Sequence, residues 1–568
     1  MEKIIKEKYE KWLKADLPQD LKEQLEMMNE EEINDCFYCD LEFGTAGIRG
    51  ILGPGSNRLN IYVIRKVSKA FAEFLLQSDP KAKEDGVVIS HDNRLYSREF
   101  TLESAKMLAS HGIKVYIFDS LRPTPELSFA VRKMHAAGGI MITASHNPKE
   151  YNGFKVYDRE GCQLTPSKIK PYIDIIKMYG SEIDTTFGNS EVKGDIVTLG
   201  KEVDLDFIEH VESILLNPQL SKNDFKIVFT PQHGTSLELA KMLFERLGYN
   251  VIYVEEQCSH DPLFGATPSP NPEDPRAYLL ALEYAKKEDA DIIMVTDPDA
   301  DRCGIAFKDA KGEYQLYTGN QTGALLIDYV LSQRKKKGLL HDNGVLFDSV
   351  VTSSFGQKVA RSYGISVESV LTGFKFIGDR IKHYEETKEK VFEFGYEESY
   401  GYVLAPFVRD KDSLQALLMI AEMTNYHLKK GKTLDVVYDE LQQVHGYHFD
   451  KLFSIYFEGQ NGKMKMDSIM SSLRENPLKE VAGVKVDYIE DYKTSVVINS
   501  NNQMIRKIDL LPSDMIKYFF EDGSTIAIRP SGTEPKCKFY YGAVGTSQKE
   551  VNEKPDLMHQ DILKILGL

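Results

Sequence analysis

The stretch Gly138-Gly139-Ile140-Met141-Ile142-Thr143-Ala144-Ser145-His146-Asn147-Pro148 sets a brief apolar run directly before a polar loop. The run is continuously apolar rather than alternating, which is typical of a short strand buried on both faces of a sheet. Asn147-Pro148 and Asn152-Gly153 are turn dipeptides. We therefore expect Ser145 to stand exposed on a tight loop at the end of a strand, where its hydroxyl is placed to react.

The same order of elements recurs three times between residues 86 and 400: strand, loop, helix, strand, loop, helix, strand, loop. The short apolar strands predict mainly parallel sheets that are covered by helices. In open α/β sheets, ligands bind beyond the carboxyl ends of the strands, so the loops after the strands should carry the chemistry. The expected strands are 87–89, 113–118 and 139–142, then 227–229, 251–254 and 291–295, then 345–347, 366–370 and 391–394.

Capping signals predict where several helices begin and end. Thr124 and Pro125 suit the N-cap and the first helical position of a helix over 125–134. Thr235 and Glu238 predict a capping box at the first helix of the second copy. Glycines are expected just beyond the first helix of each copy, at Gly112, Gly248 and Gly364.

The remainder of the chain, from about residue 450, has a different pattern. Short alternating runs predict an antiparallel sheet there, followed by a final helix over 550–566. The first forty residues predict an acidic helical lead-in with a structural role. The expected fold is thus three similar α/β domains with mainly parallel mixed sheets plus a smaller α+β C-terminal domain. The expected boundaries are 1–40, 41–205, 206–320, 321–450 and 451–568.

Composition limits the classes of protein to which the chain belongs. Its 568 residues are too many for one core and predict three to four domains. A formal charge of −16 argues against non-specific binding to nucleic acid or membranes. No apolar run approaches membrane-spanning length, and the N-terminus lacks the apolar core of a signal peptide. Six cysteines with one isolated CxxC pair, Cys36 and Cys39, indicate no disulfide framework, so we expect a cytoplasmic location.

Asp297, Asp299 and Asp301 put three carboxylates into one loop directly after an expected strand. Without a cation these carboxylates would repel one another. Hard oxygen ligands at alternate positions suit Mg²⁺. An EF-hand is excluded because Arg302 and Lys308 occupy the positions where that loop needs glycine and glutamate. A polar turn without metal is the alternative interpretation.

Ser145 and Lys155 are the candidate reacting groups. The hydrolase motif G-x-S-x-G is absent, and His146 is adjacent in sequence and badly placed to act as a base, which argues against acyl transfer. Phosphoryl transfer through a phosphoserine fits better, because positioning and electrostatics carry that reaction. Lys155 lies just after a turn and is a candidate general acid, base or charge clamp. The alternatives are a turn serine and a solvated lysine.

Three further loops have the composition of ligand-binding segments. Residues 43–50 form a glycine-rich loop with one cation, Arg49, which suits an anion but also a structural turn. Neither a GxGxxG fingerprint nor a Walker A motif occurs, so a nucleotide site is unsupported. Residues 529–536 combine cations, hydroxyls and a glycine, as a phosphate cradle or a β-turn does. Glu397 and Ser399 suit sugar hydroxyls, although a polar loop would look the same.

Taken together, these loops resemble the α-D-phosphohexomutase family over most of the chain, from Gly44 to about Lys536. Each motif is moderately specific alone, and in this order and spacing the set is highly specific. The Glu-Glu-Ser form of the sugar loop is similar to that of phosphoglucomutases, and the segments Gly44–Gly47 and Thr372–Gly378 resemble the long bacterial phosphoglucomutase branch. The family is built from four domains around one central cleft. The motifs that carry the resemblance are Thr143–Pro148, Asp297–Arg302, Gly395–Gly401 and Arg529–Thr533.

The resemblance implies a role for each motif residue. Ser145 would be the phosphoserine, and its phosphate would bind one Mg²⁺ per chain together with Asp297, Asp299 and Asp301. Arg49 and Lys155 would assist proton and phosphoryl transfer. The implied substrate-binding residues are Thr45, His146, Arg302, Gly373, Lys375, Glu397, Ser399, Arg529, Ser531, Gly532, Thr533 and Lys536.

The activity implied by the resemblance is interconversion of glucose 1-phosphate and glucose 6-phosphate, with glucose 1,6-bisphosphate as intermediate and activator. Three alternatives use the same scaffold: a phosphopentomutase, a phosphomannomutase and a glucose 1,6-bisphosphate synthase. A non-catalytic sugar-phosphate-binding protein is the alternative from another class. The expected partner is a phosphosugar, with no nucleic acid or membrane, and the chain is expected to be a monomer or weak dimer.

Overall fold

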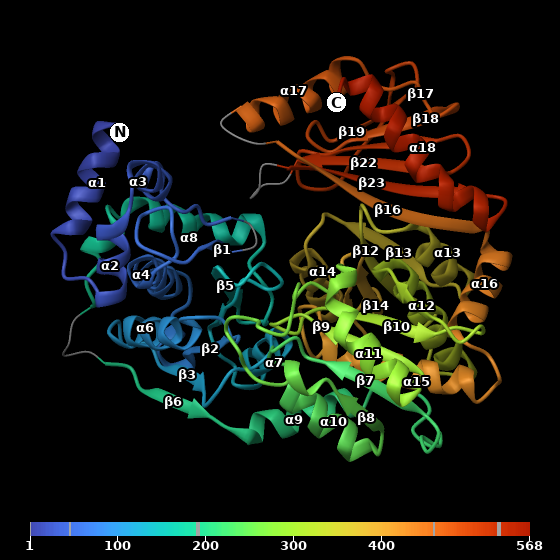
Figure 1. Cartoon of the computed structure of the whole chain (residues 1–568), viewed down its shortest axis with the longest axis horizontal. Coiled ribbons are helices and arrows are strands. Elements are labelled where there is room, and N and C mark those ends of the chain that lie inside the picture. The colour runs from blue at the N-terminus through green and yellow to red at the C-terminus, as the bar shows by residue number, and fades with distance from the viewer. Residues whose placement is uncertain (1, 45–46, 189–192, 458–460, 531–535) are drawn as a thin grey trace. The chain divides into compact units, whose positions relative to one another are not determined.

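The computed structural model describes residues 2–44, 47–188, 193–457, 461–530 and 536–568 (Figure 1). Contacts within the chain divide it into two compact units. The first unit comprises Met1–Thr322 with Gly373–Gly431, and the second comprises Gly323–Thr372 with Lys432–Leu568. In the described residues, no helix combines the length and apolar character that crossing a membrane requires.

The chain opens with three short helices, α1 (Lys3–Leu13), α2 (Gln19–Met27) and α3 (Glu30–Phe37). A capping box begins α3, in which Asn29 and Glu32 satisfy each other's main-chain N–H groups. Trp12 is buried, and its Nε1 donates to Glu182 Oε1 at 2.8 Å. The helices share an apolar cluster with Tyr62 of α4 (Ile61–Ser78), so the lead-in is part of the first α/β domain.

The first α/β domain contains a six-stranded sheet in the order β1-β5-β4-β2-β3-β6 (Figure 1). Strands β2, β3, β4 and β6 pair in parallel, whereas β5 is antiparallel to both β4 and β1. The strands are β1 (Ile48–Ile51), β2 (Val87–His91), β3 (Val115–Phe118), β4 (Gly138–Ile142), β5 (Tyr151–Asp158) and β6 (Ile196–Leu199). The remaining helices are α5 (Ala82–Asp85), α6 (Ser97–Ala109), α7 (Thr124–Lys133), α8 (Pro166–Met178), η1 (Glu182–Asp184) and α9 (Lys201–Glu212).

The second α/β domain repeats this plan with a five-stranded sheet in the order β11-β10-β9-β7-β8. Strand β9 is parallel to β7 and antiparallel to β10, so the aspartate-rich loop joins two paired strands. The strands are β7 (Lys226–Thr230), β8 (Asn250–Tyr253), β9 (Ile292–Thr296), β10 (Cys303–Lys308) and β11 (Tyr314–Tyr317). The helices are α10 (Leu237–Leu247), η2 (Glu255–Gln257), η3 (Pro275–Tyr278) and α11 (Leu279–Glu288).

The third α/β domain contributes elements to both units. In the second unit β12 (Gly344–Ser349) pairs in parallel with β13 (Ser366–Val370), with α13 (Ser354–Ser362) between them. In the first unit β14 (Val391–Glu397) is antiparallel to β15 (Gly401–Val403). The other helices of the domain are α12 (Gly319–Lys336), α14 (Phe374–Thr387), α15 (Ser413–Leu428) and α16 (Leu434–His445).

The C-terminal domain is built on an antiparallel sheet in the order β16-β23-β22-β21-β18-β19-β20, with β17 paired to β18. This confirms the predicted fold class of three α/β domains and a sheet-rich C-terminal domain. The strands are β16 (Tyr447–Tyr456), β17 (Glu480–Val481), β18 (Val484–Asp491), β19 (Val496–Asn499), β20 (Met504–Lys507), β21 (Ile516–Phe520), β22 (Thr525–Pro530) and β23 (Lys536–Gly545). The helices are α17 (Asn461–Glu475) and α18 (Gln548–Leu566).

Two of the predicted helix caps are wrong, and both residues contact the aspartate-rich loop instead. Pro123 occupies the N-cap of α7, and the Thr124 hydroxyl donates to Asp299 Oδ2 at 3.0 Å. No side-chain cap begins α10, and the Thr235 hydroxyl donates to the Pro298 carbonyl at 3.0 Å. In both cases the hydroxyl that the local pattern assigned to a helix cap donates instead to a residue of the aspartate-rich loop.

The packing of the lead-in makes a stability prediction. Replacing Trp12 with alanine removes a buried ring and leaves Glu182 without its indole donor, so we expect local destabilisation of about 3–5 kcal/mol. Amide hydrogen exchange and limited proteolysis should report faster opening of residues 3–37. Leu13→Ala is the matched control, because the Leu13 side chain is 41% exposed. Equal protection in the two variants would contradict a packed, structural lead-in.

Candidate active site

Ser145 lies in the loop between β4 and β5 with a strained backbone and a buried side chain. Its φ is 54°, in the left-handed region that L-residues other than glycine rarely adopt. Only 1% of the residue is exposed, so the expectation of an exposed serine is wrong in this structure. The reason is the aspartate-rich loop of the second domain, because Ser145 Oγ donates to Asp297 Oδ2 at 2.9 Å. His146 Nδ1 lies 3.2 Å from the same Oγ.

Arg94 holds the backbone of this loop in place. Its buried guanidinium donates to four main-chain carbonyls of the loop and its edge, at 2.6–2.9 Å, and to Asp92 Oδ2 at 3.1 Å. A planar fork of donors satisfies this many acceptors at once, which a lysine cannot do. Arg94 follows the carboxyl end of β2, so its position was predictable from the α/β rule. The segment His91–Arg94 was expected among the chemical loops, but the sequence assigned Arg94 no role.

Strands β1 and β5 carry the two predicted basic groups to the site. Arg49 pairs in register with Gly153, where a Cβ would come within 2.4 Å of the Thr143 carbonyl oxygen, so only glycine fits. Arg49 Nη1 donates to Asn147 Oδ1 at 2.8 Å, and its buried Nε has no hydrogen-bond partner among the described residues. Lys155 is buried, so the interpretation as a solvated lysine is wrong. Its ammonium donates to Asp299 Oδ2 at 2.7 Å.

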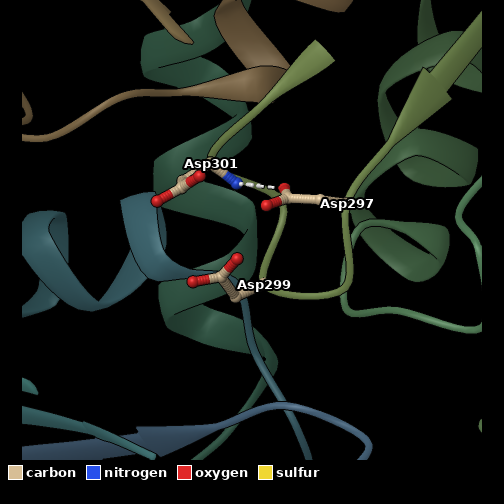
Figure 2. Close-up of side chains that lie close together, drawn as sticks. All are labelled: Asp297, Asp299 and Asp301. Carbon is tan, nitrogen blue, oxygen red and sulfur yellow. Dashed lines mark hydrogen bonds between the residues drawn. The ribbon is translucent and has the colours of Figure 1, made fainter. Parts of the chain in front are cut away.

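The three aspartates converge on one point, with ligand oxygens within 4.8 Å of one another (Figure 2). Asp297 Oδ1 accepts the main-chain N–H groups of Asp301 and Arg302, at 3.1 and 3.0 Å. Asp299 Oδ2 is held by Lys155 and by the Thr124 hydroxyl. Asp297 is thus held through both of its oxygens, whereas Asp299 and Asp301 are each held through Oδ2. Asp299 Oδ1 and Asp301 Oδ1 are buried without hydrogen-bond partners in the described part of the chain.

This arrangement fits a hard divalent cation. Burial alone would raise the pKa of Asp299, but the Lys155 ammonium outweighs it and the pKa is lowered, so this carboxylate is charged. Burial and the two neighbouring aspartates raise the pKa of Asp297. Buried carboxylate oxygens without partners are costly unless something binds them. An all-oxygen donor set of few carboxylates suits Mg²⁺.

Two further charged side chains, to which the sequence assigned no role, contact the cluster and Arg302. Lys411 Nζ lies 3.0 Å from Asp301 Oδ2, and Glu273 Oε1 accepts from Arg302 Nη1 at 2.6 Å. Lys411 is part of the charged run Arg409-Asp410-Lys411-Asp412 before α15, and a charged run by itself does not distinguish a site from a solvated surface. Arg302 Nε is buried without a hydrogen-bond partner in the residues described, and it lies 3.8 Å from Asp301 Oδ1.

The predicted sugar loop lies in the same unit as these groups. Glu397, at the end of β14, accepts the Gly373 N–H at 2.7 Å. Burial, followed by the nearby Glu398, raises the pKa of Glu397 to about 7, although Lys411 and Arg302 act in the other direction. Gly373 has a φ of 125° and precedes α14, whose second residue is the buried Lys375. Ser399 follows in the turn between β14 and β15.

Comparison with known families identifies four consecutive matches. Phosphoglucomutase/phosphomannomutase alpha/beta/alpha domains I, II and III match residues 40–181, 205–312 and 318–444, and the C-terminal domain of that family matches residues 469–558. The chain belongs to the phosphoglucomutase/phosphomannomutase family. The four matched domains occur in the order in which the fold presents them.

Relatives and solved structures agree with membership of the phosphoglucomutase/phosphomannomutase family. A phosphoglucomutase of Staphylococcus aureus (strain MRSA252) is 39% identical over 551 residues, covering 97% of this chain and 98% of that protein. One from strain bovine RF122 / ET3-1 is 40% identical, covering 93% and 94%. The parafusin (phosphoglucomutase) structure from Paramecium, in its open form, has a TM-score of 0.67 at 20% identity, covering 93% of this chain and 95% of that one. A family protein from Burkholderia thailandensis has a TM-score of 0.66 at 19% identity, covering 92% and 97%. These two structures support the fold.

The predicted site residues of this family member fall into three groups. One group surrounds the aspartate cluster or the neighbouring sugar loop in the first unit: Arg49, Ser145, His146, Lys155, Asp297, Asp299, Asp301, Arg302, Gly373, Lys375, Glu397 and Ser399. Arg529 and Lys536 belong to the second unit, on β22 and β23. Four predicted residues lie outside the described residues: Thr45, Ser531, Gly532 and Thr533.

The contacts of Arg94 predict a local effect of its replacement. Arg94→Lys keeps the charge and loses most of the hydrogen bonds to the Ser145 loop, so we expect amide exchange across residues 143–153 to accelerate by about 10- to 100-fold. Arg98→Lys is the matched control, because Arg98 Nη1 makes one hydrogen bond, to the Phe118 carbonyl. Unchanged protection of the loop in Arg94→Lys would show that the loop holds its shape without the guanidinium.

Proposed function

We propose that the chain is a phosphoglucomutase that interconverts glucose 1-phosphate and glucose 6-phosphate through a phosphoserine at Ser145. The observation that carries the proposal is the contact of Ser145 Oγ with Asp297 in the aspartate cluster. Two other members, Asp299 and Asp301, each have a buried oxygen without a hydrogen-bond partner among the described residues. A buried serine in such a cluster suits a phosphoryl carrier better than an acyl carrier, because no base and no oxyanion hole of the hydrolase type is required. Full-length relatives named phosphoglucomutase support the choice of sugar.

In this proposal Asp297, Asp299 and Asp301 hold one Mg²⁺ together with the phosphate of Ser145. The bound cation supplies positive charge where the transferring phosphoryl group develops negative charge. Two cations of the chain, Arg49 and Arg302, are assigned to the phosphoryl oxygens of the same group. The Nε atom of each is buried without a hydrogen-bond partner among the described residues.

The transfer moves one phosphoryl group and one proton. The bond between phosphorus and Ser145 Oγ breaks, and a bond forms between phosphorus and the free hydroxyl of the sugar phosphate. The proton of that hydroxyl ends on Ser145 Oγ, and Lys155 Nζ, beside Asp299, is assigned as its carrier. The Ser145 hydroxyl then donates to Asp297 Oδ2, which is the hydrogen bond seen in the structure.

The product of this first transfer is glucose 1,6-bisphosphate, which turns over in the site and returns its other phosphoryl group to Ser145. The same compound is the proposed activator, because it phosphorylates an idle enzyme. Gly373, Lys375, Glu397 and Ser399 are assigned to the sugar, and Thr45 and His146 to the side of the reacting phosphate. The non-reacting phosphate is assigned to Arg529, Ser531, Gly532, Thr533 and Lys536. Residues 41–205, 206–320, 321–450 and 451–568 are thus the proposed phosphoserine, metal, sugar and phosphate domains.

Mass spectrometry with a Ser145 variant tests the proposal. We expect glucose 1,6-bisphosphate to add one phosphate to the intact protein, mapped to Ser145, and to start turnover of glucose 1-phosphate. Ser145→Ala should take up no phosphate and lose at least about four orders of magnitude in kcat, because the covalent carrier is gone. Substantial turnover by Ser145→Ala would contradict the mechanism. A higher kcat/KM on ribose 1-phosphate would support the pentomutase alternative.

The raised pKa of Glu397 makes a second prediction for the same reaction. The ionised carboxylate of Glu397 accepts hydrogen bonds from sugar hydroxyls more strongly than the protonated carboxyl group does. Sugar binding should therefore weaken as the pH falls through about 7, which is the raised pKa of Glu397. We expect KM for glucose 1-phosphate to rise about tenfold between pH 8 and pH 6, with a smaller change in kcat. Glu397→Gln should flatten this pH dependence, which separates it from titration of the substrate phosphate. An unchanged profile in Glu397→Gln would remove Glu397 from sugar binding.

A further inference from the structure

The segment Arg409–Ser413 covers the end of the connection between β15 and α15 and the first residue of α15, and it is anchored on the aspartate-rich loop. The Ser413 hydroxyl donates to the Ala300 carbonyl at 2.6 Å. Asp412 caps α15 by accepting from two main-chain N–H groups, at 2.8 and 3.2 Å. These contacts fix the backbone on one side of Asp410 and Lys411, which lie beside Asp301.

Lys411 shares its charge between two carboxylates. Its ammonium lies 3.0 Å from Asp301 Oδ2 and 3.2 Å from Asp410 Oδ1. The stem crosses Gly401, where a Cβ would come within 2.0 Å of Lys411 Cδ, and the ammonium lies 5.4 Å from the centroid of the Phe374 ring. Burial alone would lower the pKa of Lys411, but the surrounding carboxylates raise it, so the side chain is charged.

The other oxygen of Asp410 is held by the first α/β domain. Tyr157 OH donates to Asp410 Oδ2 at 3.1 Å, and Gln163 Nε2 donates to the same hydroxyl at 3.2 Å. Tyr157 and Asp410 are both buried. Tyr157 stands two residues after Lys155 on β5, so their side chains share one face of the strand. Strand β5 therefore reaches the aspartate cluster in two ways. Lys155 contacts Asp299 directly, and Tyr157 contacts Asp410, which in turn contacts Lys411.

We propose that Tyr157 and Asp410 are positioning residues that divide the charge of Lys411 between Asp410 and Asp301, and thereby set the affinity of the aspartate cluster for its divalent cation. The inference rests on the proposed function of that cluster as a Mg²⁺ site. The Tyr157 hydroxyl disperses part of the charge on Asp410. Without the hydroxyl, Asp410 attracts the ammonium more strongly, the ammonium neutralises Asp301 less, and Asp301 binds a cation more tightly.

Direct cation binding tests this role without turnover. Mn²⁺ is titrated into the full-length protein with Ser145 dephosphorylated, and free Mn²⁺ is measured by electron paramagnetic resonance. Tyr157→Phe keeps the ring and should lower the dissociation constant by about threefold. Asp410→Asn should raise the dissociation constant by about tenfold. A negative charge near the site is lost, and the Lys411 ammonium then pairs with Asp301 alone. General loosening of the site would instead weaken binding in both variants.

Two controls isolate the path through Lys411. Tyr172→Phe removes another buried hydroxyl of the same domain, which donates to the Val67 carbonyl at 3.0 Å, and should leave the affinity unchanged. In a Lys411→Gln background, Tyr157→Phe should have no effect, because the charge that it redistributes is absent. Unchanged or weaker binding in Tyr157→Phe, or an equal effect in both backgrounds, overturns the positioning role alone. Failure of the wild-type protein to bind Mn²⁺ at all overturns the proposed metal site and this inference with it.

Discussion

Burying three carboxylates on one short loop is the constraint on which the rest of the site depends. Buried carboxylates that lie close together need positive charges nearby, because otherwise they become protonated. Lys155 and Lys411 approach from two different domains and contact Asp299 and Asp301. Main-chain N–H groups and the Ser145 hydroxyl satisfy Asp297. Asp299 Oδ1 and Asp301 Oδ1 are left without hydrogen-bond partners among the described residues, which supports the proposed cation site at this loop.

The same constraint explains why the serine loop is held so tightly. Ser145 must present its Oγ to Asp297 from a backbone conformation that costs roughly 1–2 kcal/mol. A conformation of that kind persists only when its surroundings determine it. Arg94 fixes this conformation through its hydrogen bond to the main-chain carbonyl of Ser145. Gly153 has no Cβ and therefore allows β5 to approach the carbonyl of Thr143. The proposed phosphoserine is therefore positioned by Arg94 and Gly153, neither of which is assigned to the substrate.

Local patterns in the sequence predicted most of the fold and the centre of the site, but not the contacts between domains. Continuous apolar runs located the strands because burial on both faces of a sheet leaves a mark along the chain. The spacing of the aspartates revealed the cluster because all its members lie in one loop. Lys411 was missed since it reaches Asp301 from a distant part of the chain with no motif of its own. Thr124 is a residue type that often caps helices, but its hydroxyl donates to Asp299 instead of to the helix end. The burial of Ser145 likewise arises from a loop of the next domain.

In the proposed mechanism, the charges at the site link phosphorylation of Ser145 to cation binding. A phosphoserine adds roughly −1.5 to −2 charges at neutral pH, and Mg²⁺ adds two positive charges. The phosphate alone or the Mg²⁺ alone changes the net charge around the three aspartates and the two lysines. When both are present their charges nearly cancel, and the net local charge stays close to that of the structure. Each should therefore favour binding of the other, by a coupling that is reciprocal by thermodynamic necessity. In a chain with a net charge of −16, such local compensation lets a buried loop of carboxylates accept a further anion.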